Sequence, residues 1–123
     1  MYSPLKDLKN FIDNSDVGFV NCHAHIDRAY TVNKENLTKE CEKFLTEKWK
    51  IVDEIKMLQS EEEYFLRMKY AIDSQYSMGV RSICSFIDVD SVVGLKAFNA
   101  AKKIKMDPDE KINFKMACQT LKG

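Results

Sequence analysis

The sequence has no excess of charge of either sign, because 19 lysines and arginines balance 19 aspartates and glutamates. A neutral chain creates no overall field that attracts nucleic acid or an anionic membrane, so neither partner is expected. Long hydrophobic runs are also missing: residues 17–20 and 83–87 are far shorter than the roughly 20 residues that span a bilayer. The first ten residues carry charges where a secretory signal would be apolar, which favours a cytoplasmic protein.

The sequence lacks cysteine pairs of the CxxC type. Its four cysteines are widely and unevenly spaced, which argues against a disulfide framework and a zinc ribbon; they are Cys22, Cys41, Cys84 and Cys118. We expect reduced thiols that are mostly buried in the core. GxGxxG and P-loop motifs are absent as well, so common nucleotide-binding folds are not indicated.

The chain has 123 residues, of which 45% are apolar and 31% are charged. This balance is typical of a globular protein, and the length allows at most one domain, residues 1–123. The spacing of apolar residues predicts alternating helices and strands. In chain order we expect a helix from Ser3–Pro4 to about Asn14, a strand at 17–21, helices at 37–58 and 60–79, a strand at 80–87, a helix from Ser91 to 104 or 105, a turn at 107–109 and a strand at 112–118.

Strands that alternate with helices pair in parallel, so the carboxyl ends of the three strands should share one edge of the sheet. Polar side chains follow each strand: His23 and His25 after the first, Asp88 and Asp90 after the second, Gln119 and Lys122 after the third. Parallel α/β folds place their active sites at this edge. The sequence therefore predicts a functional site there.

The His23-Ala24-His25 segment has the chemistry of a metal site. Residues two apart on a strand point to the same side, with Cα atoms about 6.5–7 Å apart, so both imidazoles can bind one divalent ion such as zinc or iron. A catalytic site needs a third protein ligand and one open position. The alternative is that both rings only hydrogen-bond to the backbone. Metal binding is favoured because no other histidines occur and Asp27 follows in the same phase.

Residues 19–28, FVNCHAHIDR, resemble the first-strand motif of the amidohydrolase superfamily, in its cytosine-deaminase-like branch. That branch has His-x-His-x-Asp followed by a basic residue. Residues 81–90, RSICSFIDVD, are similar to the branch's strand that begins with arginine and ends in Asp-Val-Asp. The resemblance covers essentially the whole chain. It implies the N-terminal portion of a (β/α)₈ TIM barrel, with about three parallel strands and flanking helices in a single incomplete domain.

This resemblance implies a metal-dependent hydrolase that acts on a carbon–nitrogen bond of a small-molecule substrate, as an amidohydrolase or deaminase. His23 and His25 would be two ligands of one or two divalent metals, zinc or iron. Such enzymes take further histidines and a catalytic aspartate from later strands, which this sequence lacks, so the 123-residue chain alone is expected to be inactive. Gln119 corresponds to a region that contacts substrate. Asp27 and Asp88 are candidate residues that support the metal ligands or the substrate.

Other interpretations stay open at several positions. Asp27 could be a loop acid, Asp90 could cap the following helix, and Arg81, at the opposite end of its strand, could form a salt bridge. Cys22 should face away from both histidines, so a nucleophilic thiol is not favoured. A second hypothesis is a small non-catalytic α/β binding module that completes its sheet as a homo-oligomer, since open strand edges favour pairing.

Overall fold

The computed structural model describes residues 3–15, 18–31 and 45–120. In chain order the elements are α1 (Pro4–Asp13), β1 (Phe19–Ala24), the short 3₁₀ helix η1 (Ile26–Arg28), α3 (Leu45–Leu58), α4 (Glu61–Ser77), β2 (Val80–Asp88), α5 (Lys96–Met106) and β3 (Asn113–Gln119). The predicted alternation of helices and strands is confirmed. The expected helical residues 37–44, and Lys122, lie outside the described residues.

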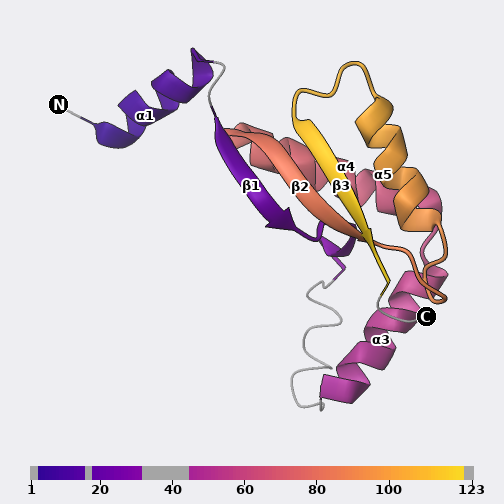
Figure 1. Ribbon diagram of the computed structural model, residues 1–123. Coiled ribbons are helices and arrows are strands. Elements are labelled where there is room, and N and C mark those ends of the chain that lie inside the picture. The colour runs from indigo at the N-terminus through magenta and orange to yellow at the C-terminus, as the bar shows by residue number, and fades with distance from the viewer. Residues whose placement is uncertain (1–2, 16–17, 32–44, 121–123) are drawn as a thin grey trace.

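The three strands form one open sheet in the order β1-β2-β3, and both pairs are parallel. Their carboxyl ends lie at one edge of the sheet, the lower edge in Figure 1. The predicted shared edge is therefore confirmed, and we call it the carboxyl rim. Among the described strands, β1 and β3 are the outer ones, so each has one unpaired edge.

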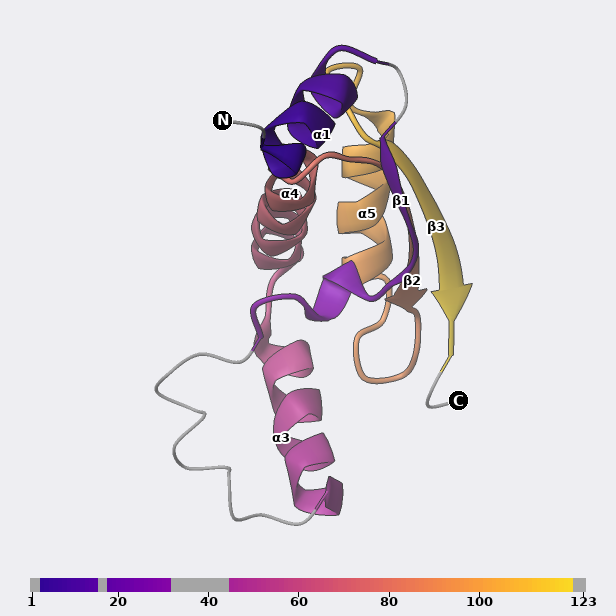
Figure 2. The same cartoon turned by 90° about the vertical axis from the view of Figure 1, so that its left-hand side faces the viewer.

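Helices α4 and α5 cover one face of the sheet, and Figure 2 shows both on the same side of it. The core lies between these layers. Its fully buried members include Met68 and Ile72 of α4, Ile83 and Ile87 of β2, and Ala97, Ala100, Ala101 and Ile104 of α5. The small alanines allow α5 to approach closely. Among the described helices, none covers the opposite face of the sheet, which is therefore open (Figure 2).

Helix α4 begins and ends as the sequence predicts. The Glu63 backbone N–H donates to Ser60 Oγ at 3.2 Å, and the Ser60 N–H donates to Glu63 Oε2 at 2.7 Å, which completes a capping box. Gly79 follows the helix with a φ of +94°, a left-handed conformation that favours glycine at a helix end. The chain then turns directly into β2.

Helix α3 projects beyond the carboxyl rim (Figures 1 and 2). The ammonium group of Lys96, at the start of α5, donates to the carbonyls of Lys56, Met57 and Gln59, at 3.1, 2.7 and 2.7 Å. A cation is favourable at a helix carboxyl end, where carbonyls lack partners within the helix. Lys96 therefore anchors the end of α3 at the rim.

The predicted start of α5 is wrong. The helix begins at Lys96, and Ser91 does not cap it. Asp90 Oδ1 instead accepts the N–H groups of Val92 and Val93, at 2.9 and 3.0 Å, and the Gly94 N–H donates to the Asp90 carbonyl at 2.8 Å. These bonds close a turn, which Gly94 permits by adopting a φ of +60°.

The prediction of mostly buried cysteines is also wrong for the described residues. Cys22 and Cys118 are exposed and Cys84 is half-buried; Cys41 lies outside the described residues. Cys22 and Cys118 lie on β1 and β3, the two edge strands, where neighbouring side chains bury them on fewer sides. A strand in the middle of a larger sheet would bury them more.

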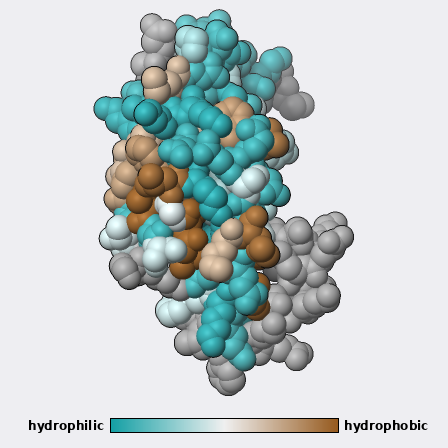
Figure 3. Space-filling model, turned by 90° about the vertical axis from the view of Figure 1, so that its right-hand side faces the viewer, coloured by the Kyte–Doolittle hydropathy of each residue, from teal (hydrophilic) through white to brown (hydrophobic). Residues whose placement is uncertain are grey.

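Hydrophobic side chains remain at the surface. Of the apolar face predicted for α1, Ile12 is buried, whereas Leu5, Leu8 and Phe11 are exposed. In the space-filling view, hydrophobic residues gather at mid-height on the left, the side on which the sheet is open (Figure 3). No helix within the described ranges is long and apolar enough to cross a membrane.

Candidate functional site at the carboxyl rim

His23 and His25 lie side by side on one face of the sheet, and an interruption in the alternation of β1 turns Asn21 to the other face. Pairing with β2 shifts between Asn21, which is opposite Ile83, and Ala24, which is opposite Ser85. Asn21 therefore points toward the helices and donates to Gln75 Oε1 at 2.8 Å, whereas the rings of His23 and His25 lie against Phe86, with centroids 5.2 and 5.6 Å away. Both imidazoles thus lie on the open face.

The Nε2 atoms of His23 and His25 are 3.3 Å apart. Two nitrogens that bind one tetrahedral zinc ion at about 2.0–2.1 Å are separated by about 3.3 Å, so the two rings fit one edge of such a site. In the part of the chain that the structure describes, no group of three or more histidine, cysteine, aspartate or glutamate side chains could hold a metal. The two imidazoles alone could therefore supply only two of the protein ligands that such a site needs.

Gln119, at the end of β3, connects His25 to Asp88, at the end of β2. Its Nε2 lies 2.8 Å from Asp88 Oδ1 and 3.2 Å from His25 Nδ1. Asp88 and Gln119 are directly opposite each other in the register of β2 and β3. The rim therefore joins one side chain from the end of each strand into a continuous polar chain.

Asp88 is the centre of a buried ionic cluster. Arg28 donates to both carboxylate oxygens, from Nη2 at 2.7 Å and from Nε at 3.2 Å, and Lys56 of α3 donates to Oδ2. The Asp88 side chain is 1% exposed and that of Lys56 is 8% exposed. Burial alone would raise the pKa of Asp88, but the hydrogen bonds from Arg28, Lys56 and Gln119 outweigh it and lower the pKa to about 2.

Asp27 supports Asp88 through the backbone. It is buried, and its Oδ2 accepts the Asp88 N–H at 2.9 Å, while Oδ1 has no hydrogen-bond partner among the described residues. Burial raises the pKa of Asp27, although the bond from the Asp88 backbone opposes this shift. Asp27 therefore holds the end of β2 against η1.

The loop after His25 is fixed by α4. Arg67 of this helix donates to the carbonyls of Asp27 and Ala29, and its Nη2 donates to Gln59 Oε1 at 2.7 Å. Tyr30 adopts a φ of 57°, a strained conformation for a tyrosine, and its ring packs edge-on against Tyr70. Such strain persists where the surrounding contacts enforce it and is concentrated at functional sites.

Four of the five candidate residues come together at the rim: His23, His25, Asp88 and Gln119. The fifth, Asp27, lies behind them. The hydrogen bonds that join His25, Gln119 and Asp88 do not include Asp90, whose carboxylate instead closes the turn that precedes α5. Arg81, as expected, lies at the opposite end of β2, where its guanidinium is 3.7 Å from the carboxylate of Asp13.

Sequence reasoning missed the roles of Arg28, Lys56 and Arg67. Arg28 was visible as the basic residue that follows the His-x-His-x-Asp motif. Val52 is on the apolar face of the helix predicted at residues 37–58. Lys56 follows it by four residues, so the two side chains lie on the same face of the helix, the one expected to be buried. No sequence signal distinguished Arg67 from a surface arginine.

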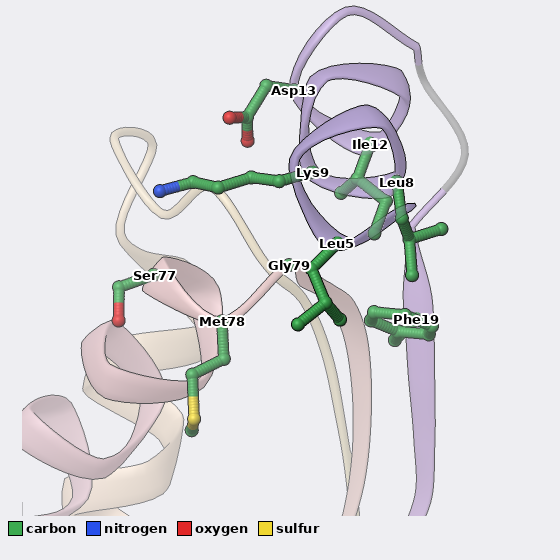
Figure 4. A pocket seen from close by; sticks show the side chains of 9 residues that line it. All are labelled: Leu5, Leu8, Lys9, Ile12, Asp13, Phe19, Ser77, Met78 and Gly79. Carbon is green, nitrogen blue, oxygen red and sulfur yellow. The ribbon is translucent and has the colours of Figure 1, made fainter. Parts of the chain in front are cut away.

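A hollow of about 230 Å³ lies at the other end of the strands, between α1, the start of β1 and the end of α4. Figure 4 shows that Leu5, Leu8 and Phe19 turn toward it and that Lys9 extends along one side. Its lining is mostly apolar, and it lies away from the histidines. This hollow is therefore separate from the candidate site.

No family model matches the chain. The chain is similar to an uncharacterized protein of Haemophilus influenzae, with 35% identity over 126 residues. The match covers the whole of this chain and 46% of the relative. The chain therefore spans about half the length of the curated relative that it matches.

Proposed function

We propose that these residues belong to a metal-dependent hydrolase that acts on carbon–nitrogen bonds, an amidohydrolase or deaminase with a small-molecule substrate. His23 and His25 would be two ligands of a divalent metal, zinc or iron. The observation that carries this proposal is the 3.3 Å separation of their Nε2 atoms, which suits two ligands of one tetrahedral ion. Their place at the carboxyl ends of parallel strands supports it, because barrel enzymes build their active sites there.

The fold would then be the N-terminal portion of a (β/α)₈ barrel. Three parallel strands with helices on one face are consistent with this architecture, in which the other face is the barrel interior. More than half of the Haemophilus influenzae relative lies outside the match, since 46% of it is covered. The remaining metal ligands and the catalytic acid–base group would come from polypeptide outside the 123 residues.

The residues of this chain would have distinct roles. A divalent ion bound here would activate water for attack and polarise the carbon that is bonded to nitrogen. His23 and His25 would hold the ion, with Phe86 packed against both rings to fix their orientation. Gln119 presents an amide beside His25 and can contact a substrate, and Asp88 orients that amide. We place this enzyme in the cytoplasm.

Zinc titration of the 123-residue chain by calorimetry tests the proposal. We expect weak binding of one ion per chain and an affinity lower by about tenfold or more in His23→Ala and His25→Ala, because ligand loss should cost at least as much as loss of a supporting residue. Cys22→Ser is the control, since this exposed thiol is next to His23 and could bind zinc nonspecifically. Equal affinity in the histidine variants and the parent chain would refute the metal site.

A second candidate function is a non-catalytic α/β module that completes its sheet by self-association. The observation that favours it is the pair of outer strands, β1 and β3, each with an unpaired edge among the described strands. Sedimentation would then show a defined dimer or larger oligomer that melts cooperatively, with no dependence on His23 or His25. A monomer at all concentrations would exclude this function.

A further inference from the structure

The orientation of the Gln119 amide has a consequence for His25. Gln119 Nε2 lies 2.8 Å from Asp88 Oδ1 and 3.2 Å from His25 Nδ1. An amide nitrogen carries two hydrogens, so it can donate to both atoms at once. In this arrangement His25 Nδ1 is an acceptor and cannot carry a proton.

Charge determines which way the amide points. Asp88 is held as a carboxylate by the half-buried Arg28 and the buried Lys56, which both donate to it. A reversed amide would place its oxygen against the carboxylate oxygen, and two acceptors at this distance repel each other. The amide nitrogen therefore faces Asp88, and the same nitrogen faces His25.

The proton of the neutral His25 ring must then be on Nε2. From there it donates across the 3.3 Å gap to His23 Nε2, which is consequently an acceptor, and the proton of His23 is on Nδ1. The two neighbouring histidines thus have opposite tautomers. The charged groups around Asp88 therefore determine the tautomers of both histidines through the amide of Gln119.

We propose that Asp88 and Gln119 are positioning residues that hold His25 in its Nε2–H tautomer when no metal is bound. A metal that binds His25 through Nε2 would displace the ring proton from that atom, and a proton on Nδ1 would not match the Gln119 amide nitrogen that Asp88 holds beside it. Metal loading would therefore have to break the contact between Gln119 and His25 Nδ1. This consequence rests on the proposed function, whereas the tautomers themselves belong to the metal-free chain.

Lys56 links the same system to α3. Its ammonium group holds Asp88, and its backbone carbonyl accepts from Lys96 at the end of the helix. Displacement of α3 from the rim would remove one of the two cations from Asp88. The tautomer of His25 is therefore sensitive to the position of this helix.

Nitrogen-15 NMR of the 123-residue chain with labelled histidine, in EDTA at pH 8.5, tests the proposal, because ring nitrogen shifts distinguish the tautomers. We expect Nε2–H for His25 and Nδ1–H for His23. Gln119→Leu, which removes the hydrogen bond to His25 together with the one to Asp88, should change the His25 tautomer ratio by roughly fivefold. Asn113→Leu, an exposed position at the other end of β3, is the matched control and should change nothing.

An Nδ1–H tautomer of His25 in the parent chain, or an unchanged ratio in Gln119→Leu, would overturn the proposal. Lys56→Met should shift the ratio in the same direction; if this variant does not fold, Gln119→Leu alone decides, because it leaves the Asp88 ion pairs intact. Zinc titration is a separate readout. If the parent chain showed the expected tautomers but bound no zinc, the metal site alone would be refuted. If it bound zinc but His25 carried its proton on Nδ1, the positioning role of Asp88 and Gln119 alone would be refuted.

Discussion

Asp88→Asn is expected to lower the free energy of unfolding by about 3–5 kcal/mol. Asparagine has nearly the same shape, so packing is retained while the charge is lost. The buried ammonium of Lys56 and the guanidinium of Arg28 then lack a counter-ion, and an uncompensated buried charge is far more costly than the loss of an exposed ion pair. Urea unfolding followed by circular dichroism measures the change.

Asp73→Asn is the matched control. Asp73 pairs with Lys69 one turn earlier on α4, at 2.9 Å, and its side chain is 59% exposed. Removal of this exposed pair should produce little measurable change. If both variants lost the same stability, the Asp88 cluster would not be the buried centre that we describe.

The stability difference between the parent chain and Asp88→Asn should shrink in acid. The pKa of Asp88 is about 2 in the folded chain, below the value of about 3.9 in an unfolded one. Its contribution is therefore complete above about pH 4 and is lost as the pH falls toward 2, by about 2–3 kcal/mol. Asp27, whose pKa is raised mainly by burial, acts in the opposite sense; both chains contain it, but the charge of Asp88, which also raises the pKa of Asp27, is missing from Asp88→Asn.

Ile72→Ala should destabilise the chain by about 2–5 kcal/mol. Ile72 is fully buried on the side of α4 that packs on the sheet, and truncation leaves a cavity that close-packed neighbours fill only partly. Leu66→Ala, on the same helix but 58% exposed, is the control and should change stability by at most about 0.5 kcal/mol. Equal effects of the two would contradict the packing of α4 on the sheet.

The larger elements could be predicted because their signals are local. Ser60 and Glu63 specify the start of α4 by hydrogen bonds within four residues, and Gly79 specifies its end by its backbone conformation. The parallel sheet followed from the alternation of helices and strands. The start of α5 could not be predicted, because Asp90 competes with Ser91 for the amides that follow, and sequence pattern does not reveal which of the two wins.

The site was predictable in its outline, but its connections were not. The places of His23, His25, Asp88 and Gln119 at one rim follow from the strand order. The ion pair between Lys56 and Asp88 depends on where α3 lies relative to the carboxyl rim, and contacts between residues far apart in the sequence determine that position. The shift in the β1 register, which separates Asn21 from His23, also depends on pairing with β2 and has no signal in β1 itself.

In the function that we propose, His23 and His25 hold one metal ion between them. Crystals of the chain grown with zinc, measured on both sides of the zinc absorption edge, test it most directly. We predict one anomalous peak at about 2.0–2.1 Å from the Nε2 atoms of both histidines. Absence of a peak there, or a peak at Cys22 or Cys118 instead, would contradict the account.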